Sequence, residues 1–212
     1  MHETTYKTII FDLGNVLIAW NPRLIYRDVF SSAEELDYFF TEVANLEWNE
    51  EQDRGRPIAE GTAALIAKHP KYEREIRMYY DRWTEAFPGA ISGTVELLQA
   101  FHRSGNYRLL ALTNWSAELF PWARAQYDFL QLFEDIMVSG EVGLKKPNPA
   151  IYELLRQRYQ LGNFEGCLFI DDSQRNVDAA QRLGLESIRF QDSEQLTLEL
   201  KQRGVISSLW SQ

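Results

Sequence analysis

The sequence contains a single cysteine and fewer basic than acidic residues. Because Cys167 has no second cysteine to pair with, no intrachain disulfide can form, and its place in the apolar run Cys-Leu-Phe-Ile predicts a buried thiol. Lysine and arginine together number 22 against 31 aspartate and glutamate residues, which gives a net charge of -9. This sign of charge disfavours binding to the phosphate backbone of a nucleic acid, so we expect no nucleic-acid partner.

The chain also lacks a long hydrophobic run. No window approaches the ~18 consecutive apolar residues of a membrane span, and the first residues have neither the basic start nor the apolar stretch of a signal peptide. Internal repeats and low-complexity tracts are absent as well. We therefore expect a cytoplasmic protein without a membrane partner, in an oligomeric state that the sequence does not indicate.

Hydrophobic residues make up 45% of the 212 residues, which is enough apolar surface for one main core. Five short apolar runs have the length of buried strands. They are Thr8–Phe11, Leu109–Leu112, Ile136–Val138, Cys167–Ile170 and Ser187–Phe190. Segments with helical spacing separate the later four runs and begin near Ser116, Asn148 and Ser173. Strands that are apolar on both faces and alternate with helices predict an α/β fold, a doubly wound parallel sheet covered by helices.

One connection is much longer than the fold requires. About a hundred residues separate the first run from the second, whereas a crossover between parallel strands needs about a dozen. Inside this interval Ser32 and Glu35 have the spacing of a capping box, and apolar residues from Leu36 to Val43 recur with a helical period. We expect a helical cap at residues 18–88, inserted into a core formed by residues 1–17 and 89–212.

Polar residues directly follow three of the five predicted strands. They are Asp12, Thr113 with Asn114, and Asp171 with Asp172. Because ligands of such sheets bind outside the carboxyl ends of the strands, these side chains are expected to meet at one edge. Lys146 lies in the loop after the third apolar run, Ile136–Val138. Pro147 fixes the turn that follows it, so Lys146 is expected at the same edge.

The expected cluster of carboxylates has a chemical consequence. Carboxylates that converge without a countercharge repel one another, and the pKa of at least one of them rises. A divalent cation removes this repulsion, and Mg²⁺ prefers hard oxygen ligands together with waters and a substrate phosphate. Lys146 could hold a phosphoryl oxygen beside the cation as a point charge. The residues therefore predict a magnesium site that accepts a phosphorylated ligand.

In these segments the sequence resembles the haloacid dehalogenase-like (HAD) hydrolases. The stretch Ile-Ile-Phe-Asp-Leu-Gly-Asn-Val-Leu at residues 9–17 is similar to the first motif of that family, with Asp12 at the position of its nucleophile. Thr113-Asn114 is similar to the second motif, Lys146-Pro147 to the third and Asp171-Asp172 to the fourth. Four motifs in the family's order form a specific signal. The resemblance implies a Rossmann-like core with the family's first type of cap. Within the family, the sequences of the motifs most resemble those of small cytoplasmic sugar-phosphate phosphatases, including bacterial glucose-1-phosphatase-like proteins.

The resemblance also implies an activity and a cofactor. It implies a magnesium-dependent phosphatase that hydrolyses a small phosphorylated metabolite, expected to be a sugar phosphate, through an aspartyl-phosphate on Asp12. The implied ligands of Mg²⁺ are the Asp12 carboxylate, the Gly14 backbone carbonyl and Asp172, with Asp171 bound directly or adjacent. Substrate binding and catalysis would further involve the motif residues Thr113, Asn114 and Lys146, which hold phosphate oxygens and neutralise charge.

Other candidate contacts lie outside the motifs. In the polar segment from Glu47 to Gly55 of the cap, Arg54 is the candidate for substrate binding, because cap loops of the family often select the substrate. The alternative interpretation of Arg54 is an exposed surface arginine that does not contact the substrate. Trp20 and Trp115 lie just beyond the first and second motifs and either wall the pocket or pack in the interior.

The sequence departs from the family's phosphatases at one position. Most of them carry a second Asp two residues after the nucleophile, which protonates the leaving oxygen, and here that position is Gly14. A positioned acid is worth about 10²–10⁴ in rate, so we expect a slow phosphatase, an acid supplied by the cap, or a different reaction. One alternative is a 2-haloacid dehalogenase that uses Asp12 on carbon; adjacent Asp171 and Asp172 disfavour it, because they would repel a halide and a substrate carboxylate. The other is a non-catalytic protein that binds a phosphorylated ligand or a partner.

Overall fold

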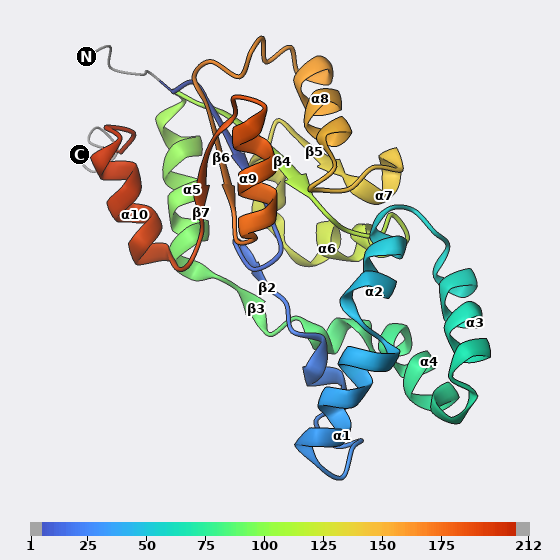
Figure 1. Cartoon of the computed structure of the whole chain (residues 1–212). Coiled ribbons are helices and arrows are strands. Elements are labelled where there is room, and N and C mark those ends of the chain that lie inside the picture. The colour runs from blue at the N-terminus through green and yellow to red at the C-terminus, as the bar shows by residue number, and fades with distance from the viewer. Residues whose placement is uncertain (1–5, 207–212) are drawn as a thin grey trace.

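The computed structural model describes residues 6–206, and five of their strands form one parallel sheet (Figure 1). The strand order is β5-β4-β1-β6-β7, and every neighbouring pair is parallel. The strands are β1 (Thr8–Phe11), β4 (Arg108–Thr113), β5 (Asp135–Val138), β6 (Cys167–Asp171) and β7 (Glu186–Arg189). The predicted doubly wound α/β fold is confirmed, and each predicted strand agrees with the observed one to within one residue at either end.

Helices cover both faces of this sheet. Side chains alternate along β1, so that Ile9 and Phe11 join one hydrophobic cluster while Ile10 joins another. The first cluster is closed by α5 (Ser92–Ser104), α6 (Phe120–Gln126), η5 (Asp128–Leu132) and α10 (Ser193–Gln202). The second is closed by α8 (Pro149–Arg158) and α9 (Gln174–Arg182), and the short α7 (Ser139–Val142) follows β5. Because both faces are buried, the inner positions of β1, β4, β5 and β6 are apolar.

Local signals in the sequence fix several helix ends. Asn148 caps α8, since its side-chain oxygen accepts a hydrogen bond from the Ala150 amide at 2.9 Å. Gly105 ends α5 in the left-handed conformation, at a φ of 64°. The helix expected to start near Ser116 begins only at Phe120, because the intervening residues first form a hydrogen-bonded turn on the Ser116 carbonyl.

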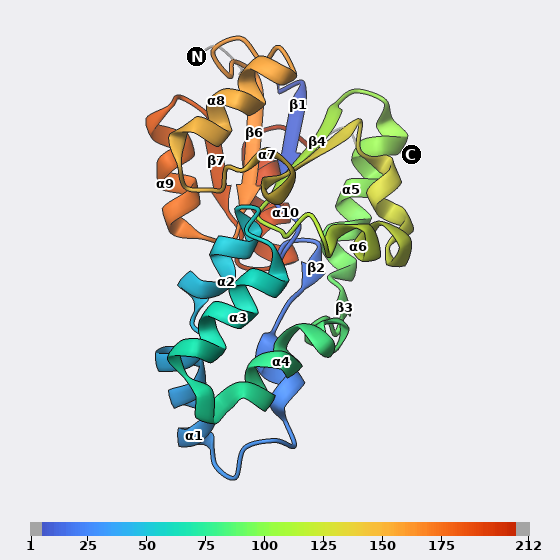
Figure 2. The ribbon, with the colours of Figure 1, turned by 90° about the vertical axis from the view of Figure 1, so that its right-hand side faces the viewer.

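The long connection between β1 and α5 forms a second group of helices. It leaves the sheet through β2 (Ile18–Ala19), which pairs antiparallel with β3 (Gly89–Ala90) on the way back. Between them lie η1 (Pro22–Tyr26), α1 (Ala33–Tyr38), η2 (Phe39–Val43), α2 (Leu46–Asp53), α3 (Ile58–Lys68), η3 (Pro70–Tyr72), α4 (Glu73–Asp81) and η4 (Trp83–Ala86). These helices share a hydrophobic cluster of their own and lie together beyond one end of the sheet (Figure 2). We refer to them as the cap helices.

The capping box and the single cysteine behave largely as their sequences predict. Ser32 caps α1 by accepting from the Glu35 amide at 3.3 Å, although the Glu35 carboxylate accepts from Ser31 rather than from Ser32 itself. Cys167 is a free, buried cysteine.

In the described part of the chain, no helix combines the length and the apolar character needed to cross a bilayer.

Candidate active site

The carboxyl ends of three adjacent strands bring the predicted acidic residues together. β1 lies between β4 and β6, so Asp12 follows β1 at the point where the strand order switches direction, next to the ends of its two neighbours. Asp171 ends β6, and Asp172 follows it. One carboxylate oxygen from each of Asp12, Asp171 and Asp172 lies within 4.8 Å of the others. The structure thus brings together the three acids that the sequence places on separate segments.

Lys146 lies beneath this cluster and is completely buried. Its Nζ is 2.9 Å from Asp12 Oδ2 and 2.7 Å from Asp171 Oδ2, and it donates to the Leu112 carbonyl at 2.8 Å. Burial opposes the charge of the ammonium group, but the two carboxylates outweigh it and raise the pKa of Lys146. Lys146 is therefore a fixed positive charge between two of the acids.

Asn114 holds the loop that carries Lys146. Its side-chain amide donates to the Lys146 carbonyl at 2.9 Å, and its oxygen accepts from the Lys146 amide at 2.8 Å. Asn114 lines the cavity described below, but both of its polar groups are used in this way. The geometry favours a positioning role for Asn114 over the substrate contact expected from the sequence.

Asp171 and Asp172 have different surroundings. Asp171 accepts from Lys146, from the Ser173 amide at 2.8 Å and from the Asn176 amide at 3.0 Å, which occupies both of its oxygens. Asp172 is less buried and lines the cavity. Burial, followed by the charge of Asp171, raises the pKa of Asp172. Asp172 is thus the better placed of the two to bind a cation directly, while Asp171 holds Lys146.

Asp12 is a buried carboxylate beside two others, so its charged form needs a nearby positive charge. Burial raises its pKa well above the ordinary value; Lys146 opposes this rise, while Asp171 and Asp172 add to it. One lysine therefore does not balance the three carboxylates. Hard oxygen donors gathered at this spacing, with a cavity in front of them, fit a hydrated Mg²⁺ ion. Gly14, whose carbonyl was expected to contribute, lines the same cavity.

A divalent cation is expected to stabilise the folded protein through this cluster. Protein stripped with EDTA should unfold at a higher temperature when Mg²⁺ is added, because a ligand at about 100 times its Kd contributes about 2.7 kcal/mol. Differential scanning calorimetry measures the shift. Asp172→Asn should abolish most of it, while Asp178→Asn, on the outer part of α9, should not. An equal Mg²⁺ response in both variants would place the ion elsewhere.

The Thr113 hydroxyl is a buried group with no protein partner. Thr113 ends β4 beside the cluster, its side chain is almost fully buried, and its oxygen makes no hydrogen bond within residues 6–206. A buried polar group without a partner costs stability, so such groups commonly serve a ligand. A phosphate oxygen would satisfy this hydroxyl.

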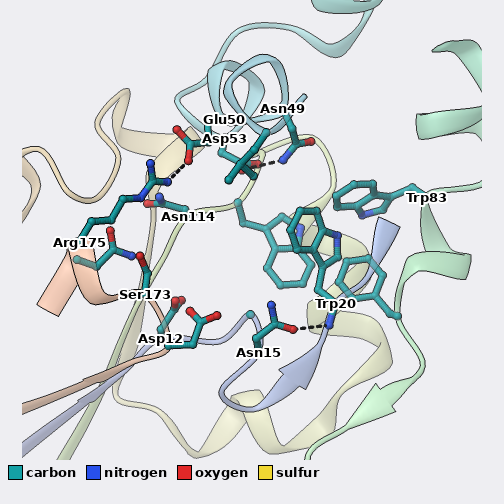
Figure 3. A pocket seen from close by; sticks show the side chains of 16 residues that line it. Asp12, Asn15, Trp20, Asn49, Glu50, Asp53, Trp83, Asn114, Ser173 and Arg175 are labelled. Atoms are coloured by element: carbon teal, nitrogen blue, oxygen red, sulfur yellow. Dashed lines mark hydrogen bonds and ion pairs between the residues drawn. The ribbon is translucent and has the colours of Figure 1, made fainter. Parts of the chain in front are cut away.

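A cavity of about 410 Å³ opens between the acidic cluster and the cap helices (Figure 3). Four of its lining residues form an aromatic wall: Trp20, Trp83, Phe87 and Trp115. Ring centroids lie 6.2 Å apart for Trp20 and Trp83 and 5.3 Å apart for Trp83 and Phe87, and Phe87 stacks on Trp115 at 5.2 Å. The cavity therefore has a charged end at the sheet and an aromatic side.

Helix α2 of the cap brings its own polar residues to the cavity, namely Asn49, Glu50 and Asp53. Glu50 is buried and forms ion pairs with Lys145 and Arg175, both of the core. Asp53 is partly buried; desolvation raises its pKa to about 7, although Lys145 and a hydrogen bond from the Ser116 backbone oppose the rise. The Ser139 hydroxyl donates to the Asp53 carbonyl, which fixes the end of α2 to the core.

The structure does not bring Arg54 to the cavity. Its side chain is 55% exposed and pairs with Glu51 of the same helix, 2.6 Å away, and it does not line the cavity. The guanidinium that does so is that of Arg175, in the first turn of α9. Sequence reasoning missed Glu50, Asp53 and Arg175; the only signal for the first two was their place in the polar cap segment that contains Arg54.

Comparisons with known proteins agree with the fold and with the family that the sequence resembles. The sequence profile described as haloacid dehalogenase-like hydrolase matches residues 6–184. The chain is 27% identical over 199 residues to a sesquiterpene phosphatase of Aspergillus oryzae, covering 94% of this chain and 97% of the relative. It is 29% identical over 116 residues to a phosphoglycolate phosphatase of Photobacterium profundum, covering 55% and 50%. A HAD family enzyme of Bacteroides thetaiotaomicron, in complex with magnesium and inorganic phosphate, superimposes with a TM-score of 0.67 at 22% identity, covering 88% of this chain and 95% of that one.

Proposed function

This chain belongs to the haloacid dehalogenase-like hydrolases, and from that premise we propose that it is a magnesium-dependent phosphatase of a small phosphorylated metabolite. The observation that carries the proposal is the meeting of Asp12 and Asp172 at the end of one cavity, with the fully buried ammonium group of Lys146 2.9 Å from Asp12. A carboxylate nucleophile, a cation site and a fixed ammonium group are what transfer of a phosphoryl group requires. The two relatives described above, both phosphatases by name, support this reading.

The reaction proposed for these residues has two steps. An oxygen of Asp12 attacks phosphorus in line, the bond to the leaving oxygen breaks, and an aspartyl-phosphate forms. Water then attacks the same phosphorus, which releases inorganic phosphate and restores the Asp12 carboxylate. The unpartnered Thr113 hydroxyl would hold a non-bridging oxygen, and Lys146, whose ammonium group already contacts Leu112, Asp12 and Asp171, would offset the developing charge as a fixed cation nearby.

The remaining residues of the cluster position these groups. Asp12, the Gly14 carbonyl and Asp172 would hold the Mg²⁺ ion, which when bound supplies positive charge to the phosphoryl oxygens. Asp171 orients Lys146 through their 2.7 Å contact, and Asn176 orients Asp171 in turn. We further propose that the cap helices, within residues 18–88, close over the substrate and exclude water. The cytoplasmic location stays a prediction.

Release of phosphate from p-nitrophenyl phosphate tests the proposal and separates it from its rivals. We expect turnover with Mg²⁺ and none with EDTA. Release of chloride from 2-chloropropionate in EDTA would instead support a dehalogenase. Binding of inorganic phosphate without turnover of any ester in a broad panel would support the non-catalytic alternative.

The aromatic wall favours a second candidate for the body of the substrate, that is, the group to which the phosphate is attached. The sequence led us to expect a sugar phosphate, whose hydroxyls need polar partners. Several polar side chains of the cavity are already engaged: Asn114 binds the Lys146 backbone, Asn15 accepts from the Trp20 amide, and Glu50 holds two cations. An apolar body, like that implied by the name of the Aspergillus oryzae relative, would pack on the aromatic wall instead. Comparing kcat/KM for glucose 1-phosphate and farnesyl phosphate decides between them.

If the body is apolar, Trp20→Ala is expected to raise the KM for farnesyl phosphate about tenfold, because the lost contact area is worth about 1.4 kcal/mol. The KM for methyl phosphate, which does not reach the wall, should not change. Trp122→Ala is the matched control, since Trp122 packs on Phe87 from outside and does not line the cavity. Equal effects of the two variants on farnesyl phosphate would count against the apolar candidate.

A further inference from the structure

The proposed reaction lacks a group that protonates the leaving oxygen. Gly14 occupies the position where related phosphatases carry that acid, and a Cβ added there would meet nothing within 4 Å. Packing therefore does not exclude a side chain at this position; the acid is simply not encoded there. If the protein is an efficient phosphatase, the proton has to come from another residue that lines the cavity.

Asp53 is the lining carboxyl group that remains after the others are assigned. Asp12 and Asp172 belong to the charged end of the cavity. Glu50 is engaged in ion pairs with Lys145 and Arg175. Asp53 has no ion pair among those formed by residues 6–206, and one of its oxygens accepts from the Asn49 amide at 3.1 Å. A carboxyl group can keep such acceptor bonds while it donates one proton.

The direction of the reaction places the leaving oxygen on the side of Asp53. Attack by Asp12 is in line, so the leaving oxygen departs on the face of phosphorus opposite to Asp12. Figure 3 shows Asp12 at one side of the pocket and Asp53, with Glu50 and Asn49, at the other. The cap thus presents a carboxyl group toward the departing atom.

Asp53 is also held firmly for a residue at the end of a helix. It is the last residue of α2, and the Ser139 hydroxyl donates to its carbonyl. The backbone at Gly55, two residues after Asp53, also lies against the core. A Cβ added there, where φ is +108°, would lie 3.0 Å from the Gly140 carbonyl oxygen. A catalytic acid requires such positioning, because small displacements lower the rate of proton transfer.

We propose that Asp53 is the general acid and base of this enzyme, supplied by the cap in place of the missing residue at Gly14. This inference rests on the phosphatase function proposed above. In the first step the Asp53 carboxyl gives its proton to the leaving oxygen as the phosphorus–oxygen bond breaks, so an alcohol departs and Asp53 becomes a carboxylate. In the second step this carboxylate takes a proton from the water that attacks the aspartyl-phosphate, which returns Asp53 to its protonated form.

The surroundings of Asp53 suit this role. Its pKa, raised to about 7 by burial, leaves a large fraction protonated near neutral pH. The ionisable groups that act on it are Lys145 of the core and, from α4, the phenols of Tyr79 and Tyr80, whose own raised pKa values keep them neutral. Since the acid form is the active one in the first step, kcat/KM should fall as the pH rises through about 7.

The decisive experiment compares two aryl phosphates that differ in the leaving group. Phenyl phosphate releases a weakly acidic phenol that needs a proton, whereas 2,4-dinitrophenyl phosphate releases a stable anion that does not. For Asp53→Asn we expect kcat/KM for phenyl phosphate to fall about 10²–10⁴-fold, with less than about a threefold change for the dinitrophenyl ester. The fall in rate above about pH 7 should also disappear. We use kcat/KM because it reports only the steps up to departure of the leaving group.

Two further variants complete the test. Glu51→Gln removes a carboxylate from the same helix on its exposed side and should change neither ester. Gly14→Asp in the Asp53→Asn background should restore part of the phenyl phosphate activity, since the open space at Gly14 admits a new acid. Equal losses with both esters would show that Asp53 only supports the structure, and an unchanged phenyl phosphate rate would show that it is not the acid.

A measurement on the unmodified protein covers the case in which Asp53→Asn does not fold. Across a series of substituted phenyl phosphates, proton donation predicts a shallow dependence of kcat/KM on leaving-group pKa. A steep dependence would overturn the proposal while leaving the phosphatase function intact. Failure to hydrolyse any ester of the series would instead contradict the proposed function itself.

Discussion

Asp12→Asn is expected to lower phosphate release by about 10⁴-fold or more, the scale on which removal of a covalent nucleophile acts. The amide keeps the size of the side chain but cannot form the aspartyl-phosphate. It also removes one of three mutually repelling carboxylates, so the variant should fold and be at least as stable without metal. The measurement is kcat with p-nitrophenyl phosphate and saturating Mg²⁺.

The design of this experiment guards against trace contamination and unfolding. Asp81→Asn, an exposed change in the cap, serves as the control and should retain full activity. Mass spectrometry after rapid acid quenching should find a phosphoryl group on the unmodified protein and none on Asp12→Asn. Activity of Asp12→Asn above about 1% of the unmodified protein would rule out Asp12 as the nucleophile.

Lys146→Met is expected to damage both stability and catalysis. Nζ lies within 3 Å of Asp12 and Asp171, at 2.9 and 2.7 Å, and its removal leaves two buried carboxylates without their shared cation. Breaking a buried pair in this way costs about 3–5 kcal/mol. Urea unfolding in EDTA should show this decrease in the free energy of unfolding, and kcat should fall by about 10²–10³ because charge on the phosphoryl oxygens is no longer offset.

The pH dependence of the same variant gives an independent check. Burial holds the Asp12 pKa above its ordinary value, so protonated Asp12 favours the folded state; this contribution is complete below about pH 4 and is lost as the pH rises through the folded-state pKa. Without Lys146, which lowers that pKa, the loss with rising pH should be larger. Lys145→Met is the matched control, since Lys145 pairs with Glu50 outside the cluster. An equal stability loss in both lysine variants would contradict the assigned role.

The core of the site was predictable because it depends on strand ends. Asp12, Thr113 and Asp171 each follow or end an apolar run, and parallel strands bring such residues to one edge whatever the length of the connections. Lys146 was predictable from its place beside Pro147, although its complete burial was not, since a lysine in a loop is ordinarily exposed.

The cap contribution was not predictable to the residue. Apart from Trp48, which packs in the hydrophobic cluster of the cap, the buried residues of α2 are polar, so the helix lacks the apolar period that identifies the inner face of a helix. Arg54 and Asp53 are neighbours, but successive residues of a helix point about 100° apart, and only one of them turns inward. Arg175 is likewise brought to the cavity by the start of α9 rather than by any pattern of its own.

Glu50 links the cap to the core through two cations on separate segments, Lys145 and Arg175. If the cap helices close over the substrate as proposed, separation of these two ion pairs would let α2 move away from the core, and Asp53, at the end of α2, would move with it. Turnover would therefore alternate between a sealed state that can react and a loosened state that can exchange its contents. Dissolved salt screens such charges and weakens both ion pairs. A higher salt concentration would therefore increase the rate of product release.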